Sequence, residues 1–101
     1  MNVQTAIVPI SYLYLDPNNY RLIDLEEYVH IDDVMLLDPS VQTRTLRFIC
    51  GKSNEGIQDL LVSFKTNGFL KLEPIQVRKI SENAYLVLEG NRRVSTLKTL
   101  Y

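Results

Sequence analysis

The stretch YLVLEGNRRVSTLKTLY, residues 85–101, decides the fold because two kinds of periodicity meet in it. An apolar run ends at Glu89 and Gly90, and an arginine pair follows one residue later. Apolar residues then recur at helical spacing, at Val94, Leu97 and Leu100. The pattern predicts a strand that turns at Gly90 into a helix over residues 91–100.

Such a corner has the chemistry of an anion site. A glycine lets the backbone approach a ligand closely, and the start of a helix presents unsatisfied N–H groups and a positive dipole end. Arg92 and Arg93 add forked donors that suit phosphate. The alternative is a plain turn followed by a polar helix face with two solvated arginines. Glu89 could orient an arginine, bind a metal or act as a base, or simply pair with Arg92 or Arg93.

Outward from the corner, alternation predicts two further strands. One is predicted at residues 73–80 and pairs with residues 84–90 around a Ser-Glu-Asn turn. The other is predicted at residues 6–15, with Pro9 at its start or at a sheet edge. A turn follows at residues 16–19. Residues 20–38 mix acidic and apolar residues without a clear period, which predicts an irregular segment with a short helix.

Two helices have clearer signals. Asp38 can cap a helix, Pro39 suits its first turn and Gly51 suits its end. The second helix covers residues 54–66 and has a predicted apolar face at Ile57, Leu60, Leu61 and Phe64. The order of elements predicts one small α+β domain with a short mixed β-sheet flanked by helices. We expect it to be the N-terminal part of a longer protein.

Composition excludes several function classes. The chain has 101 residues, 46 % of them hydrophobic, and a net charge of −1 instead of the basic excess of a free-standing nucleic-acid binder. A single cysteine and a single histidine argue against a disulfide and against a zinc site. No apolar run or leader pattern suggests a membrane span or a signal peptide, so we expect a cytoplasmic protein.

Three blocks together resemble the ParB/sulfiredoxin superfamily, the ParB-like nuclease domain. VLEGNRRVSTLKTL is similar to its phosphate motif, in the GERR or DGQRR variants. SFKTNGFLKLEPIQV resembles the upstream block, at Ser63, Phe64, Gly68, Phe69, Pro74, Ile75 and Val77. LDPNNYR resembles the N-terminal box, with Asn18 or Asn19 and Arg21. On this alignment residues 22–51 are a family-variable insertion.

The resemblance implies a nucleoside triphosphate site for CTP or ATP with Mg²⁺. Gly90, Asn91, Arg92 and Arg93 would hold phosphates, and Arg21 would reach across from the first strand. Gly68 and Phe69 would border the base or sugar, and Glu89 is the catalytic candidate. Asn91 stands where GERR has glutamate and where sulfiredoxin has its catalytic cysteine, so sulfiredoxin chemistry is not expected.

The remaining candidates have plainer interpretations. Cys50 is expected to be a buried structural thiol and His30 a surface residue. The irregular segment contains five acidic residues: Asp24, Glu26, Glu27, Asp32 and Asp33. They could hold Mg²⁺ beside a nucleotide, but a solvated acidic face is the simpler interpretation.

Three functions follow from these observations. The first is a nucleotide-binding switch or NTPase domain of a ParB-like DNA-processing, DNA-segregation or DNA-defence protein. In that case the domain would form a homodimer, and DNA would be bound through regions outside this chain. The second is a non-catalytic dimerisation or interaction module, and the third is a ParB-like nuclease. No membrane partner is expected.

Overall fold

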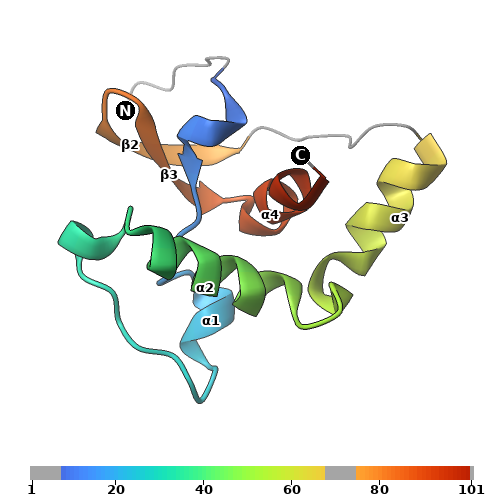
Figure 1. Ribbon diagram of the computed structural model, residues 1–101, viewed down its shortest axis with the longest axis horizontal. Coiled ribbons are helices and arrows are strands. Elements are labelled where there is room, and N and C mark those ends of the chain that lie inside the picture. The colour runs from blue at the N-terminus through green and yellow to red at the C-terminus, as the bar shows by residue number, and fades with distance from the viewer. Residues whose placement is uncertain (1–7, 68–74, 101) are drawn as a thin grey trace.

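The computed structural model describes residues 8–67 and 75–100. The predicted α+β class is confirmed, because helices pack around a mixed three-stranded sheet (Figure 1). The strands are β1 (Leu13–Tyr14), β2 (Gln76–Ser81) and β3 (Ala84–Glu89). The α-helices are α1 (Tyr20–Ile23), α2 (Pro39–Cys50), α3 (Gln58–Asn67) and α4 (Asn91–Leu100).

The sheet has the order β1-β3-β2, with β3 in the centre. The β2–β3 hairpin is antiparallel and pairs Val77 with Val87. In contrast, β1 runs parallel to β3 and pairs Leu13 with Tyr85. Parallel pairing needs a long crossover, and α1, α2 and α3 all lie within it.

The strand predicted at residues 6–15 is much shorter in the structure. Within its described part, a 3₁₀ turn at Ile10–Tyr12 precedes the two-residue β1. The Tyr12 N–H donates to the Pro9 carbonyl over 3.0 Å, so this backbone closes a local turn instead of joining the sheet ladder. Proline also lacks an N–H for sheet pairing.

Helix α2 begins and ends where its sequence signals predicted. The Asp38 carboxylate accepts from the Ser40 N–H over 2.9 Å, and hydrogen bonds from the Ser40 hydroxyl and N–H lower the pKa of Asp38. Gly51 follows the helix at φ 81°, with its N–H on the Arg47 carbonyl. The Gln42 amide joins α2 to the residue after β1, by accepting from the Leu15 N–H and donating to the Leu15 carbonyl.

The helix predicted at residues 54–66 is a 3₁₀ turn, Glu55–Ile57, that leads into α3. Gly56 is required at this turn, because a Cβ there would lie 2.0 Å from the Ile49 carbonyl oxygen. Ile57 is completely buried, as its place in the predicted apolar face suggested. The other members of that face are only half-buried, and none of the residues of α3 is buried.

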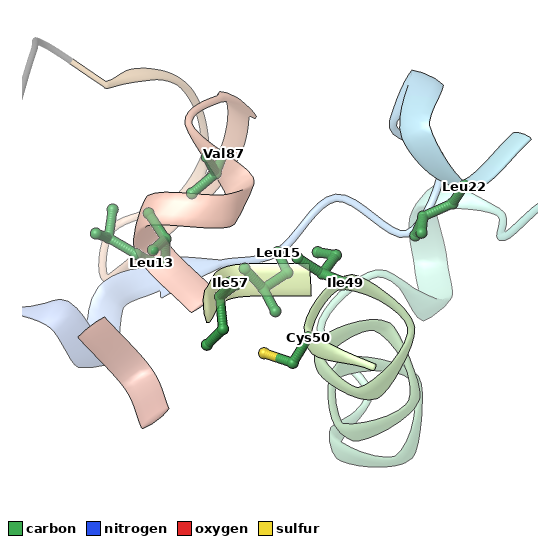
Figure 2. Close-up of a cluster of buried hydrophobic side chains, with 8 residues drawn as sticks. Leu13, Leu15, Leu22, Ile49, Cys50, Ile57 and Val87 are labelled. Atoms are coloured by element: carbon green, nitrogen blue, oxygen red, sulfur yellow. The ribbon is translucent and has the colours of Figure 1, made fainter. Parts of the chain in front are cut away.

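The core lies between the sheet, α2 and α4. Figure 2 shows its central side chains, which come from strands, helices and turns far apart in sequence: Leu13, Leu15, Leu22, Ile49, Cys50, Ile57 and Val87. The segment 22–51, predicted to be an insertion, supplies three of them. It therefore belongs to the packed body of the domain.

Helix α4 presents an unexpectedly polar face to this core. Val94 is buried as predicted, but Ser95 and Thr96 are buried beside it. The Thr96 hydroxyl donates to the Arg92 carbonyl one turn earlier, which satisfies it within the helix. Small hydroxyl residues thus share the buried face of α4 with Val94, whereas Leu97 and Leu100 of the predicted apolar face are half-buried.

Candidate functional site

The corner after β3 has the predicted geometry. Gly90 adopts φ 105°, a conformation that residues with a Cβ rarely reach. A Cβ at this position would also lie 3.1 Å from Ile75 Cγ1. The Val94 N–H donates to the Gly90 carbonyl over 3.0 Å, so α4 begins directly after the glycine. The N–H groups of residues 91–93 consequently have no acceptor within α4.

Asn91, predicted to hold phosphate, has a structural role for its side chain. It is only 7 % exposed. Its Oδ1 accepts from the Asp16 N–H over 2.9 Å, and its Nδ2 donates to the Val87 carbonyl over 3.0 Å. The side chain therefore joins the loop after β1 to β3, and only its backbone N–H points to ligand chemistry.

Arg92 also has protein partners. Its Nε donates to the Gly56 carbonyl over 3.0 Å, and its guanidinium forms an ion pair with Asp59. Both partners lie at the start of the α3 segment. Arg92 therefore connects the start of α4 to the start of α3. It also contributes positive charge to the groove.

A groove of about 510 Å³ opens beside this corner. It is lined from four directions: α1, the start of α3, the two longer strands, and the corner itself. The lining residues are Asn19, Tyr20, Arg21, Asp59, Leu60, Gln76, Leu88, Glu89, Gly90, Asn91, Arg92 and Arg93. Three arginines face two carboxylates in this set, a net charge of +1, and one carboxylate, Asp59, is already paired with Arg92.

Arg21 was expected to reach the site from the first strand. In the structure it reaches the groove from α1. The turn before it is fixed by Asn19, whose Oδ1 accepts from the Arg21 N–H over 3.1 Å. The Arg21 guanidinium lies 5.5 Å from the centre of the Tyr20 ring, a cation–π distance. Arg21 is thus placed on the same groove as residues about 70 positions away.

The structure brings together six of the eight predicted site residues: Arg21, Glu89, Gly90, Asn91, Arg92 and Arg93. The other two, Gly68 and Phe69, lie outside the described residues. Sequence reasoning missed Tyr20 and Asp59 as groove residues. An aromatic residue directly before the predicted Arg21 was the available signal for Tyr20, whereas nothing in the sequence linked Asp59 to Arg92.

The other candidate residues lie away from the groove. Cys50 is buried, and its desolvation raises the pKa of the thiol, as expected for a structural cysteine. His30 is exposed. Asp33 of the acidic segment pairs with Arg78 at 3.7 Å. Within residues 8–67 and 75–100, no three metal-binding side chains gather closely enough to hold an ion.

Comparison with known proteins adds no assignment: protein-family models, curated proteins and solved structures each return no match to this chain. None of the helices in the described part of the chain combines the length and apolar character that crossing a bilayer requires.

Proposed function

We propose that the groove beside Gly90 binds a nucleoside triphosphate, as in a ParB-like domain. The observation that carries the proposal is the convergence of Arg21 with Arg93 and the start of α4 on one groove. These positions belong to two separate sequence blocks that resemble the family. The volume of about 510 Å³ lies within the ~300–1,000 Å³ range of small-molecule sites.

The groove suggests a division of roles along the nucleotide. Phosphate oxygens would accept from the first N–H groups of α4, with Arg93 and Arg21 supplying charge. Tyr20 is 65 % exposed on the same groove and offers a flat surface to a base. Glu89 is an exposed carboxylate that could hold Mg²⁺, which keeps most of its ligands as water and phosphate oxygens.

Hydrolysis is a further step in this proposal, with Glu89 as the candidate base. The wider role would be that of a nucleotide switch within a DNA-processing protein. Both statements rest on the sequence resemblance and on the position of Glu89 immediately before the corner.

Calorimetric titration with CTP, ATP and GTP, each with and without Mg²⁺, tests the proposal. We expect saturable binding of at least one nucleotide, weakened when Gly90→Val blocks the corner. Lys79→Ala is the matched control, because Lys79 is exposed on β2 and does not line the groove. Absence of binding by all three nucleotides would contradict the proposal.

One observation favours an interaction module as the second candidate. Helix α3 carries Leu60, Leu61, Val62 and Phe64, yet none of its residues is buried. It lies at the end of the molecule opposite the β2–β3 hairpin in Figure 1. Sedimentation of the wild type and of Val62→Gln would show whether this helix mediates self-association.

A further inference from the structure

A second hollow lies between α1, α2 and the strap, the name used here for residues 24–31. Asn18 holds the far end of the strap in place. Its Nδ2 donates to the Ile31 carbonyl over 2.8 Å, and its Oδ1 accepts from the Ile31 N–H over 2.9 Å. The Tyr28 hydroxyl donates to the same oxygen over 3.1 Å. The strap is therefore fixed to the loop before α1 through Tyr28 and Ile31.

The side of the strap is held by α2. The Arg44 guanidinium donates to the Glu27 carbonyl over 2.9 Å and lies 5.1 Å from the centre of the Phe48 ring. The one arginine at this hollow is therefore engaged with the strap and an aromatic ring. Arg44 therefore connects α2 to the strap.

The hollow beneath the strap is mainly apolar. Its lining includes Leu22, Leu25, Tyr28, Val29, Ile31, Val41 and Phe48. Its volume is about 200 Å³, below the ~300–1,000 Å³ typical of small-molecule sites. A space of this size suits one or two apolar side chains, as the anchor pockets of protein interfaces do.

The exposed charges of the strap and of the residues that follow it are acidic, whereas the lining of the hollow itself includes Arg44. Residues 22–43 contain six carboxylates and no lysine or arginine. Five of these acidic residues are exposed: Asp24, Glu26, Glu27, Asp32 and Asp33. Exposed apolar side chains lie among them, with Val29 61 % exposed. This charge would repel nucleic acid and anionic membranes, and it would attract a cationic partner.

We propose that the strap hollow binds a basic peptide segment of another protein. One apolar side chain of that segment enters the hollow, and its lysines or arginines lie along the acidic strap. The apolar anchor supplies affinity, and the charge selects the partner and speeds its approach. This site is separate from the nucleotide groove, because the two share no lining residue.

The test uses the whole chain and a fluorescent peptide of about 14 residues, four turns of helix, built from leucine and lysine. A leucine–glutamate peptide of the same pattern is the charge control. Polarisation should show binding of the lysine peptide only, weakened by salt and by the double change Glu26→Gln with Glu27→Gln. Equal binding of both peptides would overturn the proposal.

Two valines of the same acidic stretch distinguish the hollow from general attraction. Val29 lines the hollow, whereas Val34 is 91 % exposed and does not. Val29→Gln should weaken binding about tenfold, the effect of losing an anchor contact, and Val34→Gln should leave it unchanged. Equal effects of the two changes would place the peptide elsewhere.

Sedimentation of the free chain tests whether a second copy of the chain fills the hollow. If the hollow is filled by a second copy, the chain will be dimeric and Val29→Gln will make it monomeric. That result, together with no peptide binding, would overturn the proposal. The peptide experiments remain valid even if no nucleotide binds to the groove, because neither valine lines the groove.

Discussion

At the scale of single residues, both arginines of the corner line the groove. Arg92 is engaged with Gly56 and Asp59 and connects two helices. Arg93 is half-buried and lines the groove together with Arg21. Substitution of Arg93 tests the proposed nucleotide binding, whereas substitution of Arg92 also breaks its connection to the α3 segment.

Arg93→Ala should weaken nucleoside triphosphate binding by about 1.5–3 kcal/mol, the contribution of a hydrogen bond to a charged group. Calorimetry provides the affinity, and thermal unfolding of the same variant measures any accompanying change in stability. Lys79→Ala removes the same charge outside the groove and should bind normally. Wild-type affinity in the Arg93 variant would remove this residue from the site.

Tyr20→Ala should distinguish the base from the phosphates. Stacking of one base on an aromatic ring contributes about 1–3 kcal/mol, so affinity for the preferred nucleotide should fall by that amount. Affinity for inorganic tripolyphosphate should stay the same, because that ligand has no base. A parallel loss for both ligands would indicate that Tyr20 shapes the groove instead of contacting a base.

At the scale of elements, polar side chains connect strands and helices that are far apart in the sequence. Gln42 joins α2 to the residue after β1, and Asn91 joins the loop after β1 to β3. Both side chains pair with backbone groups beside the short β1, which makes few sheet contacts of its own. The packing of the parallel strand therefore depends on amides that come from helices.

Asn91→Ala should destabilise the domain, since it leaves the Asp16 N–H and the Val87 carbonyl without these partners. Each buried group left unpaired costs about 1–3 kcal/mol. Urea unfolding measures the change, with Asn83→Ala in the exposed hairpin turn as the control. If the Asn91 variant is as stable as the control, the hydrogen bonds of the Asn91 side chain do not stabilise the corner.

Two positions at the start of the α3 segment should respond differently to alanine substitution. Ile57→Ala should cost roughly 2–5 kcal/mol, because Ile57 is completely buried and the change leaves a cavity. Leu60→Ala should cost less, since Leu60 is only half-buried on the groove side. Unfolding midpoints in the reverse order would show that α3 packs through its groove-side face.

At the scale of the whole molecule, charge is divided between two regions. Residues 22–43 carry only acidic charges, whereas the second half of the chain contributes most of the basic residues. The total of 11 lysines and arginines against 12 aspartates and glutamates leaves little net attraction for a polyanion. A local phosphate site is compatible with this balance, but a broad nucleic-acid surface is not favoured.

Duplex DNA should therefore bind this chain only weakly, at ~10⁻⁴ to 10⁻⁶ M or poorer, without sequence preference. Adding salt should weaken the complex strongly. A polarisation titration at near-physiological salt checks this expectation. Tight, sequence-dependent binding would mean that the chain itself recognises DNA, contrary to the proposal that its groove serves a nucleotide.

Local patterns in the sequence determined much of this protein. Capping and turn residues set the limits of α2, alternation located the β2–β3 hairpin, and Gly90 located the corner before α4. These features depend on interactions within a few residues, so the chain encodes them directly. The placement of residues 89–93 at this corner could be predicted for the same reason.

Tertiary structure alone decided which partners those residues have. The sequence offered no sign that Asn91 would bond to Asp16, that Arg92 would pair with Asp59, or that α3 would stay largely uncovered. It also suggested a strand up to Leu15, most of which is absent from the sheet within the described residues. Such contacts join positions far apart in the chain, and their geometry exists only once the core has packed.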